Sequence, residues 1–104
     1  MKITLVCNAG MSTSVLVQKM QKAATEQGVD VEIAAYSVEV LEDLLSKEKI
    51  DCVLIGPQIR HMKPNIDKTV NGRAPVALID MRHYGTINGL AVLQQAIALI
   101  EQKG

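Results

Sequence analysis

The segment KITLVCNAGMSTS, residues 2–14, joins a short apolar run to the start of an amphipathic one. Lys2–Val6 is rich in residues that favour β-strands, and the run stops at Cys7. From Ser12 or Thr13 onward, the spacing of apolar residues changes to that of one helix face. That helical stripe consists of Leu16, Met20, Ala23 and Ala24. The segment therefore predicts a strand, a tight loop and a helix in direct succession.

The same succession of strand and helix patterns recurs three more times along the chain. Residues 29–36 alternate apolar and polar side chains, which is typical of a strand with one face against the core. CVLI, residues 52–55, and VALI, residues 76–79, are apolar throughout, as expected for strands covered on both faces. Three more helices are predicted over apolar stripes, which consist of Val38, Leu41, Leu44 and Leu45; Ile59, Met62, Ile66 and Val70; and Leu90, Leu93, Ile97 and Ile100.

Turn and cap residues place the boundaries of these elements. Gly28 is a fitting end for the first helix, and Ser37 is a plausible cap for the second. Gly56-Pro57 ends the third strand and begins a helix, because proline suits the first helical position. Pro64 is expected to distort that helix, since it lacks the N–H of the helical ladder. DMRHYGTING, residues 80–89, is predicted to be a loop.

These four strand–helix pairs predict an α/β fold with a parallel sheet, right-handed crossovers and helices on both faces. The strand with alternating polar residues belongs at an edge, which gives the strand order 2-1-3-4 of a truncated flavodoxin-like sheet. The topological switch point then lies between the first and third strands, where ligands favour the carboxyl ends. Three loops meet there, with sequences CNAGMSTS (7–14), GPQIRH (56–61) and DMRHYG (80–85). Residues 1–104 are expected to form one domain.

Length and composition argue against several other classes of protein. The 104 residues are 48% apolar and contain no Trp or Phe, so aliphatic side chains and Met must fill the core. Acidic and basic residues balance to zero net charge, which argues against a nucleic-acid or membrane-surface partner held by bulk electrostatics. No apolar run approaches the roughly 20 residues that span a bilayer, and the N-terminus is too short for a secretory signal. With two cysteines, a reducing cytoplasm is expected.

Cys7 lies where the first strand meets the first helix, and this position favours a bound anion. The N–H groups at a helix start are unpaired, and the helix dipole adds a positive potential. Thiols at such positions have pKa values below about 8.5, so we expect thiolate near neutral pH. Gly10 lets the backbone curl around a bound group, and Ala9 leaves space for it. Hydroxyl donors or helix caps are supplied by Ser12, Thr13 and Ser14.

This combination predicts a cysteine that accepts a phosphoryl group, whose oxygens are held by the loop amides. The alternative is a buried cysteine that acts as a small hydrophobic side chain, which is common for free thiols. Cys52 opens the third strand, whereas Cys7 closes the first, so a parallel sheet places them roughly 15 Å apart. A disulfide needs Cα atoms about 4.4–6.8 Å apart, so Cys52 is expected to be buried and inert. No ligand cluster suggests a metal ion, and no cofactor is implied.

Three motifs in this order resemble those of a known family. They are CNAGMSTS, VLIGPQI (53–59) and ID…YG…NGL (79–90). The chain resembles the lactose/cellobiose-type IIB component of the bacterial sugar phosphotransferase system, and this resemblance covers essentially the whole chain. The resemblance implies that a phosphohistidine on a IIA partner gives its phosphoryl group to Cys7. It also implies that Cys7 passes the group to a sugar, of β-glucoside or disaccharide type, held by a membrane IIC partner. The phosphate loop would then consist of Asn8, Ala9, Gly10, Met11, Ser12, Thr13 and Ser14. When free, the domain is expected to be a monomer.

Two alternatives stay open at this point. Low-molecular-weight protein tyrosine phosphatases and arsenate reductases share this topology, but they carry Cys-x5-Arg, whose guanidinium clamps the phosphoryl oxygens. Here the corresponding position is Thr13, and Asp80 is the only obvious acid or base for hydrolysis. Because a relay protein needs a phosphocysteine that survives until the acceptor docks, the missing arginine favours relay over hydrolysis. A non-catalytic regulatory module on the same fold is the second alternative.

Polar residues of the other two loops are weaker candidates for the site. Gln58 and Tyr84 either hydrogen-bond near the phosphate or shape a partner surface, although exposed loop residues are often simply solvated. His61 and His83 are interpreted as surface residues. Basic residues gather in the second half of the chain, and we expect them to form one side next to the crevice that steers acidic partners. They are Arg60, Lys63, Lys68, Arg73 and Arg82.

Overall fold

The computed structural model describes residues 1–7 and 11–103 and contains the predicted parallel sheet. The strands are β1 (Lys2–Cys7), β2 (Glu32–Ser37), β3 (Cys52–Ile55) and β4 (Val76–Leu78). Their order is β2-β1-β3-β4, and every neighbouring pair is parallel, as predicted. The switch point therefore lies between β1 and β3, at the edge of the sheet where both strands end.

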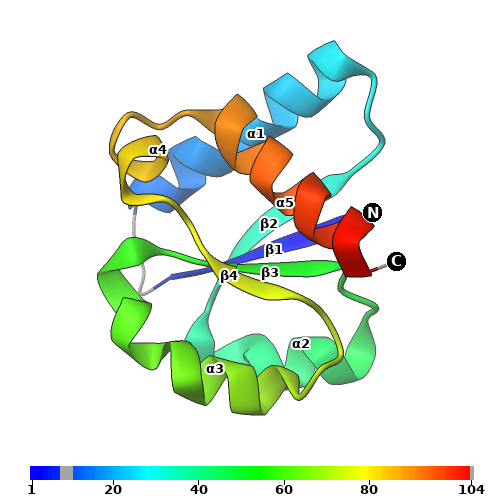
Figure 1. Ribbon diagram of the computed structural model, residues 1–104, viewed down its shortest axis with the longest axis vertical. Helices are drawn as coiled ribbons and strands as arrows, with labels where there is room; N and C mark the ends of the chain where they lie inside the picture. Colours follow the sequence, from blue (N-terminus) through cyan, green and yellow to red (C-terminus); the bar gives the residue numbers. More distant parts are fainter. Residues whose placement is uncertain (8–10, 104) are drawn as a thin grey trace.

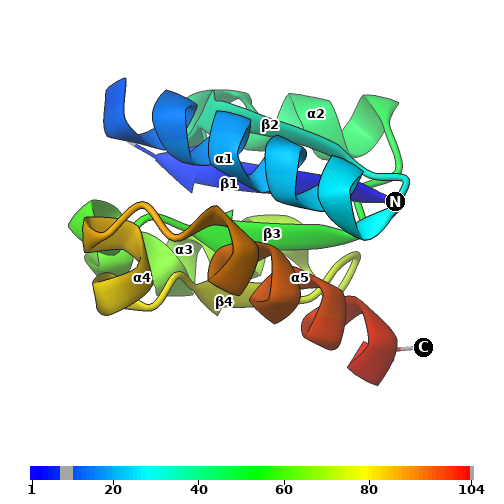
Figure 2. The ribbon, with the colours of Figure 1, turned by 90° about the horizontal axis from the view of Figure 1, so that it is seen from above.

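Helices cover both faces of the sheet (Figures 1 and 2). On one face lie α1 (Met11–Gln27) and α5 (Gly89–Lys103), packed side by side. On the other face lie α2 (Leu41–Lys47) and α3 (Lys63–Val70). Short 3-10 segments, η1 (Val38–Val40) and η2 (Pro57–Met62), lead into α2 and α3. A five-residue helix, α4 (Met81–Gly85), lies at the carboxyl end of the sheet.

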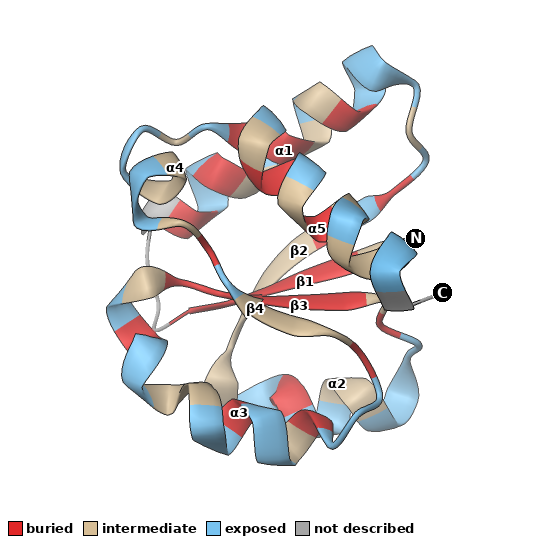
Figure 3. Cartoon of the chain, viewed as in Figure 1, coloured by how far each residue is buried: buried red, intermediate tan, exposed pale blue. Residues whose placement is uncertain are grey.

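Side-chain alternation along the central strands builds a core on each face of the sheet. Ile3 and Leu5 pack with the α1 and α5 side, whereas Val6 packs with the α2 and α3 side. Figure 3 shows β1 and β3 buried along their length and the edge strands β2 and β4 only partly covered. The predicted stripe of α1 is confirmed, because Leu16, Met20 and Ala24 are all buried. The core is therefore aliphatic, as the composition requires.

Two predictions for residues 80–90 are corrected, one on a helix and one on the burial of a side chain. The predicted loop 80–89 contains α4, because the Asp80 side chain accepts a hydrogen bond from the Arg82 N–H at 2.8 Å and caps the helix. So short a helix has no periodicity for a sequence pattern to reveal. Leu90, predicted to face the core, is 40% exposed. Because α5 begins at a buried Gly89 pressed against α1, its fully buried residues are Val92, Leu93 and Ala96. The other predicted members of the stripe, Ile97 and Ile100, are partly buried against the same core.

Three smaller predictions are also corrected by the packing. Ser37 occupies the cap position of η1, but its side chain makes no cap hydrogen bond with any described residue. VALI was expected to be covered on both faces, yet Val76 and Ala77 are only partly buried and Leu78 is exposed. Pro64 lies in the first turn of α3, where its missing N–H costs nothing, and the irregular backbone falls at Ile59 instead.

Thr4 carries a buried hydroxyl and lies on the same face of β1 as Val6, toward α2 and α3. The residue is fully buried, and its Oγ1 has no hydrogen-bond partner among residues 1–7 and 11–103. A buried hydroxyl without a partner costs about 1–3 kcal/mol. We therefore expect Thr4→Val, which keeps the β-branched shape, to raise the free energy of unfolding by about 1 kcal/mol in urea titrations.

Thr13→Val is the matched control for this substitution. Thr13 is also a buried threonine, but its hydroxyl lies 3.0 Å from the Tyr84 hydroxyl. Removing a made hydrogen bond costs about 0.5–1.5 kcal/mol, so this variant should be less stable than the wild type. A Thr4→Val variant that is destabilised as much as Thr13→Val would show that the Thr4 hydroxyl is satisfied in solution.

Candidate functional site

Cys7 is the last residue of β1 and lies at the carboxyl edge of the sheet, as predicted. It is 7% exposed, and its backbone pairs in register with Ser37 of β2. Helix α1 begins at Met11, four residues further along the chain. The thiol therefore sits at the switch point, close to a helix start with unpaired N–H groups that favour an anion.

Part of the predicted phosphate loop falls outside the described residues. Asn8, Ala9 and Gly10 lie there, and so do the side chains of Met11 and Ser12. Their roles stay predictions. Of the remaining two hydroxyl residues, Ser14 is exposed and Thr13 is 1% exposed.

Gly56 brings the loop after β3 against Cys7. Its N–H donates a hydrogen bond to the Val6 carbonyl at 2.9 Å. A Cβ at Gly56 would lie 3.8 Å from the Cβ of Cys7 and 3.0 Å from Oε1 of Gln58. A side chain at position 56 would crowd the Gln58 amide. Sequence reasoning treated this glycine only as a strand end, although its place directly after a fully apolar strand is a signal of close backbone approach.

Hydrogen bonds join Thr13, Gln58 and Tyr84 across three elements. Nε2 of Gln58 donates to the Tyr84 hydroxyl at 2.9 Å, and Tyr84 Oη lies 3.0 Å from Oγ1 of Thr13. Thr13 lies in the first turn of α1, Gln58 in η2 and Tyr84 in α4. Of the two flanking residues predicted from the sequence, Tyr84 thus contacts Thr13 of the predicted loop directly, and Gln58 contacts Tyr84.

The connection from α4 to α5 holds Tyr84 in this place. Ile87, between the two helices, has φ 51°, a left-handed conformation that is unusual for a β-branched residue. Its N–H donates to the Tyr84 carbonyl at 3.1 Å, and its side chain packs against the core. Packing therefore holds a strained turn that sets where α4, and with it Tyr84, lies.

Asp80 is poorly suited to the acid role that a phosphatase would require. Its carboxylate accepts the backbone N–H of Arg82, and this hydrogen bond is the main cause that lowers its pKa below the ordinary value. At neutral pH the group is therefore ionised and has no proton to give to a leaving group. His61 is exposed, as predicted, whereas His83 is half-buried in α4.

Cys52 is far from Cys7 and chemically inert, as predicted. The residue pairs in register with Ile3, at the opposite end of β1 from Cys7. It is fully buried, and burial raises the pKa of its thiol to about 12. Both cysteines are free thiols.

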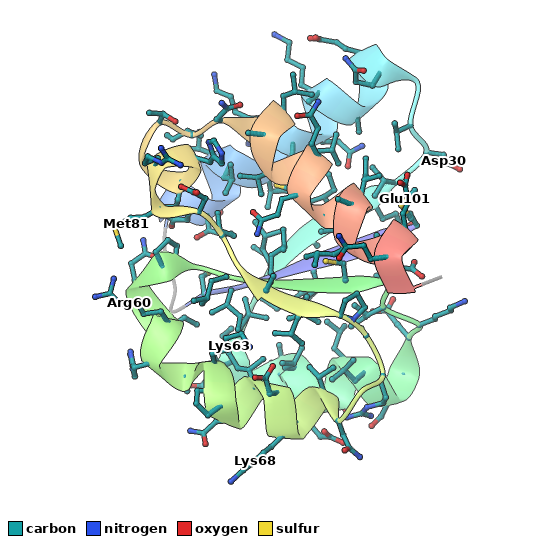
Figure 4. All side chains as sticks on the ribbon, viewed as in Figure 1. Asp30, Arg60, Lys63, Lys68, Met81 and Glu101 are labelled. Atoms are coloured by element: carbon teal, nitrogen blue, oxygen red, sulfur yellow. The ribbon has the colours of Figure 1, made fainter. Side chains whose placement is uncertain are left out.

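The basic residues do not form the single surface expected from the sequence. Figure 4 shows Arg60 with Met81 at the carboxyl end of the sheet and Lys68 on the far side of α3. Arg73 bonds to Glu42 at 2.9 Å, and Lys63 bonds to Asp67 at 2.9 Å. Because β4 begins just after Arg73, that residue lies at the opposite end of the sheet from the site. The prediction that all five lie on one side next to the crevice is wrong, and steering of a partner stays a prediction.

Residues 1–7 and 11–103 contain neither a cluster of metal ligands nor a membrane-spanning helix. Among them no group of three His, Cys, Asp or Glu side chains could hold a metal ion. No helix in the same ranges has both the length and the apolar character needed to cross a membrane.

This geometry defines a class of protein. It is an open parallel α/β domain with one nearly buried thiol at the switch point, directly before a helix start. Such a position suits a cysteine that works on an anionic group. The phosphatases considered above and sugar-phosphotransferase IIB components share this plan, and they differ in the residue six positions after the cysteine, which is Thr13 here.

The chain belongs to the lactose/cellobiose-specific IIB subunit family of the phosphotransferase system (PTS), whose family model matches residues 2–95. It is 44% identical over 98 residues to a galactose-specific EIIB component of Lactococcus lactis subsp. cremoris, covering 90% of this chain and 91% of the relative. It is 43% identical over 98 residues to a cellobiose-specific EIIB component of Lactococcus lactis subsp. lactis, with the same coverage. The solution structure of a cellobiose-specific IIB component from Borrelia burgdorferi matches with a TM-score of 0.82 at 37% identity, covering 100% of this chain and 94% of that one.

Family membership confirms the resemblance drawn from the three motifs. The chain is a phosphotransferase component of sugar transport. As a IIB component, it is expected to work with IIA and membrane IIC partners. The relatives named above differ in their sugar at nearly the same identity, so similarity alone does not assign one here.

Proposed function

We propose that Cys7 accepts a phosphoryl group from a phosphohistidine of the IIA component and passes it to a sugar bound by the membrane IIC component. The observation that carries this proposal is the position of Cys7 at the end of β1, before the start of α1, in a chain of the IIB family. The second cysteine is buried at the opposite end of the sheet and offers no alternative nucleophile.

The first transfer is an in-line displacement at phosphorus. The Cys7 thiolate forms the S–P bond as the P–N bond to histidine breaks, and the imidazole nitrogen keeps the electron pair and takes up a proton. Loop amides and the helix start stabilise the charge on the three phosphoryl oxygens. We assign this cradle to residues 8–14.

The second transfer returns the cysteine to its starting state. A sugar hydroxyl oxygen forms the O–P bond as the S–P bond breaks, which leaves the thiolate. The sugar hydroxyl gives its proton to a base outside this chain. We propose a β-glucoside or disaccharide-type sugar, because a cellobiose-specific relative is among the similar proteins. We further propose that residues 1–104 act as one domain, monomeric when free, in the cytoplasm beside the membrane permease.

Labelling with phosphorylated IIA tests this function. We expect one phosphoryl group per chain, in an acid-stable but iodine-labile linkage, on the peptide that contains Cys7. Rapid turnover of an aryl phosphate by the protein alone would instead identify a phosphatase. A protein that shows neither activity would be a non-catalytic module on the same fold. The low pKa of Asp80 and the threonine at position 13 support the first outcome.

A further inference from the structure

The Tyr84 hydroxyl is a junction between three segments that are distant in the sequence. Gln58 lies 26 residues from it and Thr13 lies 71 residues from it, yet both are within hydrogen-bond distance. The segments are η2 after β3, α4 after β4 and the first turn of α1 after β1. All three follow the carboxyl ends of strands that neighbour one another in the sheet, so the junction lies at the edge that carries Cys7.

The hydrogen bonds of this junction allow one continuous order of donation. Nε2 of Gln58 can only donate, so the Tyr84 oxygen acts as the acceptor at 2.9 Å. The single proton of the Tyr84 hydroxyl is then available for Thr13 Oγ1, which is 3.0 Å away. If Thr13 accepts that proton, its own hydroxyl proton is left for another acceptor. Both contacts are therefore compatible with donation from Gln58 to Tyr84 and from Tyr84 to Thr13.

Packing holds Tyr84 and Thr13 in place, whereas the Gln58 side chain is exposed. Oε1 of Gln58 faces Gly56, where the missing Cβ leaves room for it beside Cys7. Thr13 is 1% exposed, so water has little access to replace Tyr84 as its partner. Tyr84 itself is held by α4 and packs against the core. The Thr13 hydroxyl is thus oriented from one side by protein groups alone.

We propose that Gln58 and Tyr84 are positioning residues that orient the Thr13 hydroxyl as a hydrogen-bond donor to the phosphoryl group on Cys7. This proposal rests on the proposed function. Thr13 stands where the related phosphatases carry their arginine. An oriented hydroxyl contributes one neutral hydrogen bond in place of the bidentate, charged clamp of a guanidinium. The site then holds the phosphoryl group but leaves it free to be passed on.

Single-turnover transfer from phosphorylated IIA to Cys7 tests the order of donation. Tyr84→Phe and Thr13→Val should each lower the transfer rate about tenfold, as expected for a lost hydrogen bond to a charged group. Thr13→Ser, which keeps the hydroxyl, should retain more of the rate than Thr13→Val. Gln58→Met should slow transfer severalfold, and adding it to Tyr84→Phe should cause no further loss, because Gln58 acts through Tyr84.

Tyr36→Phe is the matched control, because it removes the hydroxyl of the other tyrosine, on edge strand β2. This variant should transfer at the wild-type rate. The proposal is overturned if the wild type is labelled on Cys7 and both Tyr84→Phe and Thr13→Val are labelled at the wild-type rate. Additive losses in the Gln58→Met, Tyr84→Phe double variant would overturn the role of Gln58. A wild type that takes no label at all would instead refute the proposed function. Should Thr13→Val fail to fold, Tyr84→Phe and the double variant carry the test.

Discussion

A Cys7→Ala variant should accept phosphoryl groups from phosphorylated IIA at less than about one thousandth of the wild-type rate. In the proposed transfer the sulfur of the Cys7 thiolate forms the new bond to phosphorus, so this substitution removes the nucleophile. Ser14, an exposed residue in the first turn of α1, carries a hydroxyl that ionises far less readily than a thiol. The measurement is the rate of label transfer to the chain in a single turnover.

Cys52→Ala is the matched control for the loss of a thiol. Cys52 is fully buried at the opposite end of the sheet, and burial raises the pKa of its thiol to about 12. Its thiol is therefore uncharged and inaccessible at neutral pH, and this variant should be labelled at the wild-type rate. Label that persists in Cys7→Ala and disappears in Cys52→Ala would refute the assignment of Cys7 as the nucleophile.

Gly89→Ala should cause the largest loss of stability among glycine-to-alanine substitutions at the glycines that the structure describes. A Cβ at this position would lie 2.5 Å from the carbonyl carbon of Lys19 and 2.6 Å from the nitrogen of Met20. Both are backbone atoms of α1, so no side-chain rotation can relieve the contact. The start of α5 must move away from α1, which we expect to lower the free energy of unfolding by about 3 kcal/mol. Urea titration of the purified variant measures the change.

Gly85→Ala is the matched control, because it adds the same methyl group at the end of α4. No described atom lies within 4 Å of the Cβ that this substitution adds. We expect its free energy of unfolding to stay within about 0.5 kcal/mol of the wild type. Equal urea midpoints for the two variants would mean that α5 does not approach α1 as closely in solution.

The Gly89 contact also concerns the site. Helix α5 anchors the strained turn at Ile87, and that turn sets the position of α4 and of the Tyr84 hydroxyl. If α5 moves away from α1, the distance between Tyr84 and Thr13 changes with it. Close packing of α5 on α1 at Gly89 therefore also affects the position of Tyr84 at the carboxyl edge of the sheet.

Most of the fold was predictable because burial leaves a local trace in the sequence. CVLI matches β3 residue for residue, and the alternating run 29–36 overlaps the edge strand β2, which extends from Glu32 to Ser37. The role of Asp80, in contrast, was not predictable from the sequence. It could be read as a possible acid from its type, but its role as a helix cap depends on a backbone turn of only a few residues.

The sequence alone determined the alternation of strands and helices, the parallel order of the sheet and the position of Cys7 at the end of the first strand. These features follow from the period of apolar residues and from the rules that connect parallel strands, and they need no knowledge of distant contacts. Only the tertiary structure decided that Leu90 faces outward and that Gly89 touches the backbone of α1. Only the tertiary structure, too, joined Gln58 and Tyr84 to Thr13, because hydrogen bonds across 26 and 71 residues form only where the strand ends bring their loops together.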